Sequence, residues 1–168
     1  MKIRDASLKD TTLLFLVRRD DAGAVSEICL AMKKRGFGTG KWNGVGGKLE
    51  PGESIEEAAR REAEEEIGVQ VGKLCQVAQL EFRYAPRPDW DQLVHVFFAE
   101  DWEGEPIESE EMKPGWFPVA DIPFSSMWPD DSIWLPEVLY GNRIRGTFRF
   151  GEGETILEHE IHRVDDFR

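Results

Sequence analysis

The sequence predicts one α/β domain, residues 1–168, in which a mixed sheet carries helices on both of its faces. Strand-like apolar runs stand before, between and after two helix-like segments, an order typical of helices layered on a sheet. The chain has 168 residues, which suits a single domain with its own core. Its 40% of hydrophobic and 11% of aromatic residues exclude a disordered acidic chain.

The strands are expected where β-branched and aromatic residues stand between turn residues. A first hairpin turns at Asp20-Asp21-Ala22-Gly23, and a last one turns at Gly151-Glu152-Gly153. The expected strands are residues 11–18, 26–32, 76–84, 93–100, 115–118, 147–150 and 155–160. Their placement around the helices favours a mixed sheet.

The helix predicted over Ile55–Ile67 has a signal at each end. Ser54 suits its N-cap, with Glu57 completing a capping box, and Gly68 suits the position after its last turn. Apolar residues recur every four positions, which gives the helix one buried stripe. Two further segments are expected, a glycine-rich loop at residues 36–47 and a short helix at 133–140 that contains Pro136.

The charge is strongly acidic but local. The chain has 21 Lys+Arg and 33 Asp+Glu, a net charge of −12 at pH 7. Residues 50–66 carry eight glutamates and two arginines, and residues 100–111 carry seven acidic residues and no basic one, so the remainder is nearly neutral. A polymeric nucleic acid is therefore not an expected partner, because phosphate binding needs a basic surface. A nucleotide bridged by metal ions is not excluded.

Cysteines and apolar runs indicate a soluble, cytoplasmic protein without a membrane partner. Cys29 and Cys75 lack the spacing of metal ligands and stand in apolar runs, so both are expected to be buried thiols. The apolar run 13–17 is too short for a signal peptide or a membrane span.

One face of the predicted helix carries Glu62, Glu65 and Glu66, at positions i, i+3 and i+4. Three like charges on one face repel one another, and a divalent cation would compensate them, since Mg²⁺ prefers oxygen ligands. The charge pattern alone leaves a second interpretation open, a solvated surface helix with an excess of glutamate.

The spacing around these glutamates decides between the two. Gly47 is followed after five residues by Glu53, and after seven more by the segment 61–69, Arg-Glu-Ala-Glu-Glu-Glu-Ile-Gly-Val. This matches the Nudix box in full, and a chance match to its seven specified residue types is far rarer than about 1 in 10⁵. The chain therefore resembles the Nudix hydrolases. The resemblance implies the Nudix fold, an α/β/α sandwich with a curved mixed sheet, and Mg²⁺-dependent hydrolysis of a nucleoside diphosphate linked to another group.

The resemblance also assigns a role to each matched position. The catalytic residues would be Glu62, Glu65, Glu66 and Glu111, and these with Gly46 would hold Mg²⁺, or Mn²⁺ in its place. Glu66 would be the innermost ligand, and Gly46 would contribute its carbonyl. The structural positions of the motif would be Gly47, Glu53 and Arg61, with Arg61 directed away from the metal and paired with Glu53.

The segments around the box resemble the MutT-type Nudix hydrolases that act on oxidised purine nucleoside triphosphates, over about residues 11 to 160. This implies a base pocket in which Asn43, Asp130 and Asp131 form hydrogen bonds and Trp128 stacks on the base. The other wall residues would be Thr12, Lys33, Phe37, Phe82 and Trp134. Of the two adjacent aspartates, one is expected to keep its proton and act as a donor. The loop 84–92 departs from the family pattern and leaves the preferred oxidised purine open.

Without the resemblance, blander interpretations apply to the same residues. Segment 128–131 would be a surface turn, with Asp131 or Ser132 capping the second helix. Phe37 and Phe82 would be ordinary core residues. The basic residues Lys33, Lys34, Arg35 and Lys41 would be a plain rim, or would attract a triphosphate.

The expected activity is hydrolysis of 8-oxo-dGTP and 2-hydroxy-dATP to the monophosphate and pyrophosphate, which would remove damaged nucleotides from the pool. One alternative is a Nudix pyrophosphatase for O6-alkyl-dGTP, dinucleoside polyphosphates or ADP-ribose. Another is a non-catalytic nucleotide sensor on the same fold, although a sensor has no need of the complete glutamate set. The expected partner is a small nucleotide bound by a monomer.

Overall fold

A computed structural model describes residues 8–168. The strands are β1 Lys9–Arg19, β2 Val25–Lys33, β3 Trp42–Asn43, β4 Gln70–Val71, β5 Cys75–Tyr84, β6 Gln92–Ala99, β7 Trp102–Glu103, β8 Met112–Pro118, β9 Arg143–Phe150 and β10 Ile156–Val164. The helices are α1 Ile55–Ile67 and α2 Asp131–Leu139, with 3₁₀ turns at Pro88–Trp90, Val119–Asp121 and Phe124–Ser126. Residues 1–7 lie outside the described residues. They form the start of the N-terminal segment in which no signal peptide is expected.

The main sheet is mixed, as the sequence predicts. Its eight strands follow the order β10-β9-β5-β6-β1-β2-β3, and β8 also pairs with β2. The β1–β6 and β5–β9 pairs are parallel, whereas β1–β2, β5–β6 and β9–β10 are antiparallel. The parallel β1–β6 pair places Thr12 opposite His95 near the centre of the sheet, so residues far apart in the chain meet there.

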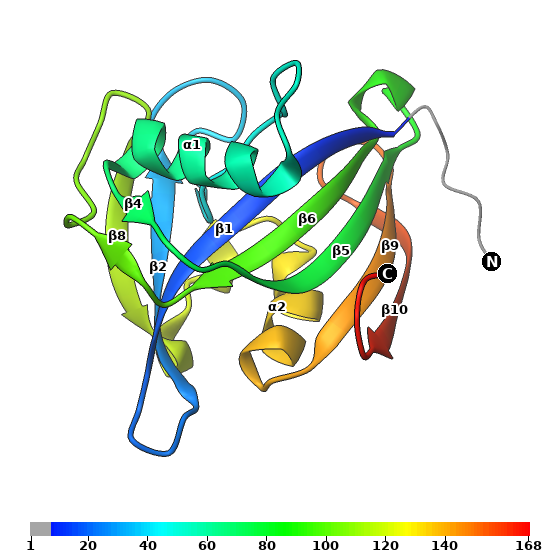
Figure 1. The fold of residues 1–168 in the computed structure, drawn as a ribbon. Coiled ribbons are helices and arrows are strands. Elements are labelled where there is room, and N and C mark those ends of the chain that lie inside the picture. The colour runs from blue at the N-terminus through cyan, green and yellow to red at the C-terminus, as the bar shows by residue number, and fades with distance from the viewer. Residues whose placement is uncertain (1–7) are drawn as a thin grey trace.

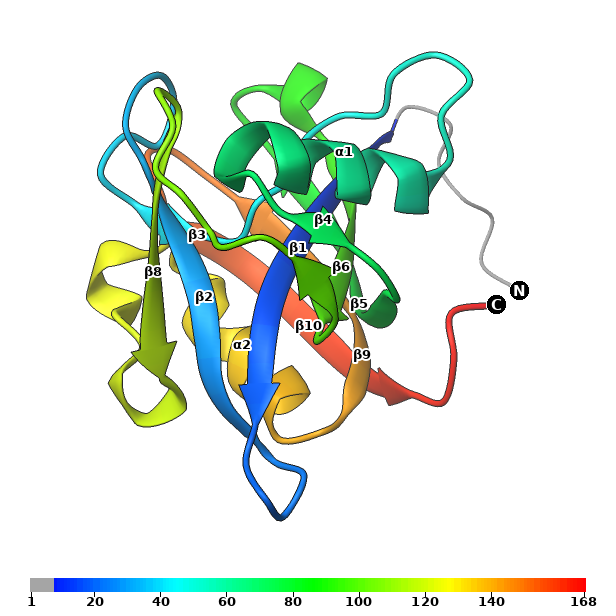
Figure 2. The same cartoon turned by 60° about the vertical axis from the view of Figure 1, so that its left-hand side comes forward.

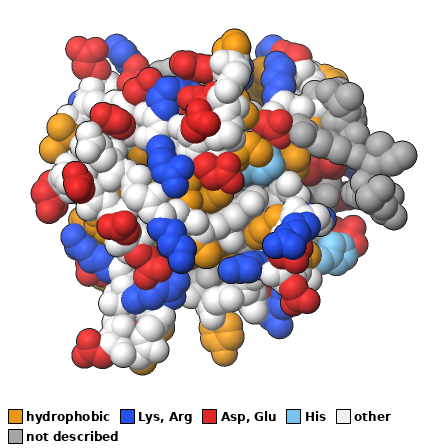
Figure 3. Space-filling model, viewed as in Figure 1, with side chains coloured by type: hydrophobic (Ala, Val, Ile, Leu, Met, Phe, Trp, Pro, Cys, Tyr) orange, Lys and Arg blue, Asp and Glu red, His pale blue; other side chains and the backbone are white. Residues whose placement is uncertain are grey.

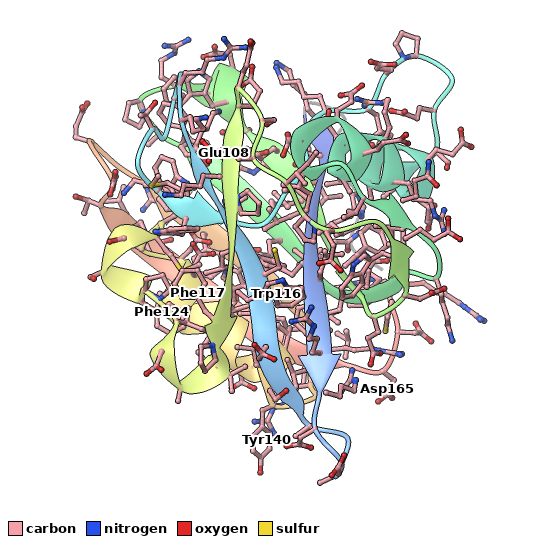
Figure 4. All side chains as sticks on the ribbon, turned by 90° about the vertical axis from the view of Figure 1, so that its left-hand side faces the viewer. Glu108, Trp116, Phe117, Phe124, Tyr140 and Asp165 are labelled. Atoms are coloured by element: carbon pink, nitrogen blue, oxygen red, sulfur yellow. The ribbon has the colours of Figure 1, made fainter. Side chains whose placement is uncertain are left out.

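Helices cover both faces of this sheet, which confirms the predicted layers. Figures 1 and 2 show α1 on one face and α2 on the other. Ala59, Ala63 and Ile67 of α1 belong to one buried cluster, and Trp134 and Leu135 of α2 belong to the other. Figure 4 shows Trp116 and Phe117 on opposite sides of β8, where they pack against these two clusters. The core is therefore two apolar layers separated by the sheet.

The capped helix is predicted to the residue, whereas the strand ends are not. The hydroxyl of Ser54 accepts a hydrogen bond from the Glu57 N–H at 3.1 Å, and Gly68 has the left-handed φ of 72° expected after the last turn. Strand β9 begins four residues earlier than predicted, because Arg143 and the residues after it pair with β10 and β5. The short strands β3, β4 and β7, two residues each, carry no periodic pattern and are not predicted.

Two local predictions are wrong. Cys75 is only half-buried at the start of β5, whereas Cys29 is buried as expected. Helix α2 begins at Asp131, two residues before the predicted start, and no side chain caps it. The Ser132 hydroxyl instead donates to the Pro129 carbonyl at 3.4 Å. The alternative interpretation of Asp131 and Ser132 as helix caps is therefore wrong.

Over residues 8–168, no helix is long and apolar enough to cross a membrane. Acidic and basic side chains are interleaved over the face that carries α1 (Figure 3). The acidic side chains on this face are thus mixed with basic ones rather than gathered into one patch.

Candidate active site

The glycine loop passes directly between β1 and α1. The Thr12 N–H donates to the Gly47 carbonyl at 2.9 Å, and the Gly46 N–H donates to a Glu66 carboxylate oxygen at 3.4 Å. A Cβ on Gly47 would lie 2.7 Å from Oε1 of Glu62. Only glycine allows this approach without displacing the carboxylate. The loop therefore brings backbone groups against the glutamate face of α1.

Arg61 ties this loop to the helix through a hydrogen-bonded fork. Its guanidinium donates to both carboxylate oxygens of Glu53, at 2.6 and 3.0 Å, which is the pairing predicted from the motif. It also donates to the Lys48 carbonyl at 3.1 Å, to Glu62 at 3.0 Å and to Glu65 at 3.1 Å. The expectation that Arg61 is directed away from the metal-binding glutamates is wrong. One guanidinium fixes the loop and restrains two of the three glutamates.

We expect Arg61→Lys to lower the melting temperature by several degrees and to reduce hydrolysis about 10- to 100-fold, because an ammonium group cannot hold the fork. Calorimetry and pyrophosphate release would measure the two effects. Arg60→Lys is the matched control, since Arg60, on the same helix, donates to the Gly72 carbonyl and, among the described residues, to none of the glutamates held by Arg61. Equal effects of the two changes would contradict the role given to Arg61.

Glu62 and Glu66 come together, whereas Glu65 does not join them. Burial, and after it the neighbouring Glu62 carboxyl, raise the pKa of Glu66 to about 9. Glu65 is exposed, with 57% of its side chain accessible, and is held by Arg61. Two carboxyl groups this close and this sheltered share a proton at neutral pH. The Glu62–Glu66 pair thus has more negative charge than its positively charged neighbours compensate.

Glu111 is placed by contacts that the sequence does not signal. Its carboxylate accepts hydrogen bonds from Arg35, which hold its pKa below the usual value. The Ser109 hydroxyl donates to the Glu66 carbonyl at 2.9 Å and accepts from the Glu111 N–H at 3.2 Å. The loop that carries Glu111 is therefore fastened to the end of α1, and its start at Glu108 lies at the top of β8 in Figure 4. Nothing in the local sequence marks Ser109 or Arg35, because both act across the fold.

The donor set fits a hard divalent cation. Within residues 8–168, no three acidic, histidine or cysteine side chains converge as a metal site, because arginines hold Glu65 and Glu111. The Glu62–Glu66 pair nevertheless supplies adjacent carboxylate oxygens. A cation bound between them would replace the shared proton and compensate their charge.

A cavity of about 910 Å³ opens beside the Gly46–Gly47 segment. It is lined by eight of the nine predicted pocket residues: Thr12, Lys33, Phe37, Asn43, Phe82, Trp128, Asp130 and Asp131. Trp134 is the exception. It is fully buried in the core, and its indole N–H donates to Asp130 at 2.8 Å. The prediction of Trp134 as a pocket wall is therefore wrong: it supports Asp130 from behind.

The two aspartates are both buried at the base of this cavity. Burial raises the pKa of Asp130 to about 6, while the Trp134 hydrogen bond opposes that shift. Burial and the charge of Asp130 raise the pKa of Asp131 well above its usual value. The Asp131 carboxyl also accepts the Trp128 N–H at 3.1 Å. One neutral carboxyl is thus favoured in the pair, which agrees with the prediction of a protonated donor.

Aromatic rings form the mouth of the cavity. Phe37 stacks on Trp128 with ring centroids 5.2 Å apart, and Trp90 contacts Phe37 at 5.1 Å. Phe37 is 62% exposed. Its interpretation as an ordinary core residue is therefore wrong. Trp90 comes from the loop whose role the sequence leaves open, and it forms part of the wall.

The basic residues of the loop are largely paired with acidic residues of distant segments. Lys34 contacts Glu108 at 2.6 Å, and Lys41 contacts Glu154 at 2.9 Å while lying over the Trp128 ring. Arg35 is paired with Glu111. For Lys34, Arg35 and Lys41 the interpretation as a plain basic rim is therefore wrong, and no local sequence signal marks Glu154, which is 113 residues from Lys41.

Comparison with known proteins places this site in a family. The family model described as NUDIX domain matches residues 8–138, and the chain belongs to the Nudix hydrolase family. Members of this family generally use divalent metal ions.

Two curated relatives cover most of the chain. The oxidized purine nucleoside triphosphate hydrolase of Danio rerio is 48% identical over 139 residues, 83% of this chain and 88% of the relative. The protein of the same name from Mus musculus is 46% identical over 140 residues, 83% of this chain and 89% of the relative. Among solved structures, a MutT protein from Bacillus halodurans is similar with a TM-score of 0.78 and 26% identity, covering 92% of this chain and 97% of that one.

Proposed function

We propose that this chain hydrolyses oxidised purine (deoxy)nucleoside triphosphates, such as 8-oxo-dGTP and 2-hydroxy-dATP, to the monophosphate and pyrophosphate with Mg²⁺. The carrying observation is the aromatic cavity with two buried aspartates beside the Gly46–Gly47 segment, which contacts the glutamate helix α1. The names of the two relatives with 46–48% identity support the same substrate class. The enzyme acts as a monomer on free nucleotides in the cytoplasm, where this activity removes damaged precursors.

The cavity offers each element that a purine needs. The Trp128 ring provides a stacking face for the base. Asn43 uses its side-chain oxygen to accept the Gly44 N–H at 2.8 Å, which directs the amide N–H₂ group toward a ligand. Asp130 and Asp131 present one acceptor and one donor. Exchange of the proton between them lets the same pocket accept a 6-oxo and a 6-amino purine.

The glutamate side of the site would hold Mg²⁺, with Mn²⁺ as a substitute. Glu62, Glu66 and the Gly46 carbonyl would be its first ligands, and Glu65 and Glu111 would add to them if released from their arginine partners. When bound, Mg²⁺ polarises the phosphoanhydride and lowers the pKa of the attacking water. The protein's own part is to hold these oxygens on α1 and the glycine loop while the cavity orients the base.

A substrate panel tests the proposal. Pyrophosphate release with Mg²⁺ is expected from 8-oxo-dGTP and 2-hydroxy-dATP at a kcat/KM at least about 10-fold above that for dGTP, the discrimination of one or two hydrogen bonds. Hydrolysis of ADP-ribose or dinucleoside polyphosphates alone would reject the substrate assignment. Nucleotide binding without any turnover would favour a sensor.

A further inference from the structure

Gln92 presents a carboxamide side chain to the cavity, close to Tyr84 and Trp90 in its lining. It is the first residue of β6, and it pairs with Phe82 of β5, whose ring packs against the core cluster on the α2 side of the sheet. Gln92 lines both the main cavity and an adjoining cavity of about 410 Å³. Its amide therefore lies where a ligand of the main cavity can reach it.

Two neighbours fix the orientation of this amide. The buried Thr11 hydroxyl donates to the Gln92 Oε1 at 2.9 Å, and the Gln92 Nε2 donates to the Tyr84 hydroxyl at 3.4 Å. The Tyr84 ring is itself stacked on Phe150, with centroids 5.1 Å apart. Among the described residues these are the amide's side-chain hydrogen bonds, so one lone pair on Oε1 and one N–H on Nε2 remain for a ligand.

Tyr84 links Gln92 to the aspartate end of the cavity. Burial raises the pKa of Tyr84 to about 12, with the charge of Asp130 among the additional causes. The phenol therefore stays protonated at neutral pH, and its oxygen can accept the amide N–H. A base held by Asp130 and Asp131 would share its cavity with the Gln92 amide.

We propose that Gln92 is a specificity-determining residue that recognises the lactam edge of an 8-oxopurine, an inference that rests on the proposed function. That edge carries a donor, N7–H, beside an acceptor, the C8 carbonyl. A carboxamide matches it with two hydrogen bonds, N7–H to Oε1 and Nε2–H to the carbonyl oxygen. An unmodified purine offers an acceptor at N7 and a C–H at C8, so the same amide is left unsatisfied.

Binding of nucleoside monophosphates without metal tests this role apart from hydrolysis. For Gln92→Met, which keeps the length of the side chain, we expect calorimetry to show about 10-fold weaker binding of 8-oxo-dGMP and a change of less than twofold for dGMP. The affinity for 2-hydroxy-dAMP, which lacks the C8 carbonyl, should change less than twofold as well. Gln79→Met is the matched control: Gln79 belongs to the neighbouring strand β5 and is absent from the lining of both cavities.

Two outcomes would overturn the inference: an unchanged ratio of 8-oxo-dGMP to dGMP affinity in Gln92→Met, or an equal loss for all three nucleotides. Thr11→Val provides a second variant, since it removes the hydroxyl that orients the amide and should lower the same ratio severalfold. If the wild type binds 8-oxo-dGMP selectively, Gln92→Met removes that selectivity and the wild type does not hydrolyse 8-oxo-dGTP, the proposed function fails while the role of Gln92 is supported.

Discussion

Replacing Glu66 with glutamine is expected to reduce hydrolysis by about 10³-fold or more and to raise the melting temperature of the metal-free protein. The loss of activity follows because an amide is a poor ligand for Mg²⁺ and carries no charge to hold it. The gain in stability follows because Glu66 is sheltered from water beside Glu62. A neutral side chain of the same shape removes that repulsion.

The pH dependence gives this prediction a sign. The pKa of Glu66 is about 9 in the folded protein, above its ordinary value of about 4.3 in an unfolded chain. Its stabilising contribution is therefore complete at low pH and is lost as the pH rises toward 9. The difference in melting temperature between Glu66→Gln and the wild type should grow from pH 5 to pH 9.

Thermal unfolding with and without Mg²⁺ measures both effects. Mg²⁺ should raise the melting temperature of the wild type and leave that of Glu66→Gln nearly unchanged, because a ligand stabilises only a protein that binds it. Glu64→Gln is the control, since Glu64 is exposed on the same helix. Turnover near the wild-type rate in Glu66→Gln would overturn the assignment of the glutamate helix.

Replacing Asp130 with asparagine is expected to lower kcat/KM for 8-oxo-dGTP about 100-fold and to affect 2-hydroxy-dATP less. Asparagine can still accept the Trp134 N–H through its oxygen. It then directs an N–H₂ group toward the base where the carboxylate would have accepted, and it cannot exchange a proton with Asp131. Because the two bases present different edges, the losses should be unequal. Equal losses for the two substrates would contradict proton exchange in the pocket.

The thermal stability of Asp130→Asn should rise relative to the wild type, whereas its activity falls. The pKa of Asp130 is raised to about 6. The wild type therefore loses stability as the pH rises from about 4 through 6, because the unfolded chain gives up the proton first. Asp130→Asn should flatten that decline and melt higher than the wild type at pH 8. Asp121→Asn, at an exposed aspartate, should change neither property.

Local signals account for what the sequence predicts well. The bounds of α1 follow from Ser54 at one end and Gly68 at the other, both of which act within one turn of the helix. The chemical role of the helix is predicted from the fixed spacing of residues along the same segment. The resemblance to the Nudix box also implies the Arg61–Glu53 pair, which the structure contains.

Contacts between distant segments account for what it misses. Trp134 is aromatic, as a pocket wall would be, but the packing of α2 on the sheet directs its side chain into the core. Ser109, Arg35 and Glu154 act on partners 43 to 113 residues away, so no local pattern marks them. The ends of strands are predicted poorly for the same reason, since a strand extends as far as its neighbour pairs with it.

The pairing of the loop cations with Glu108, Glu111 and Glu154 bears on the speed of substrate capture. A free cluster of lysines and arginines would draw a triphosphate in from a distance and make association fall steeply with salt. Here Lys34, Arg35 and Lys41 are largely neutralised by their own chain. These paired cations therefore contribute little long-range attraction, and kcat/KM should not fall steeply as ionic strength rises through the physiological range.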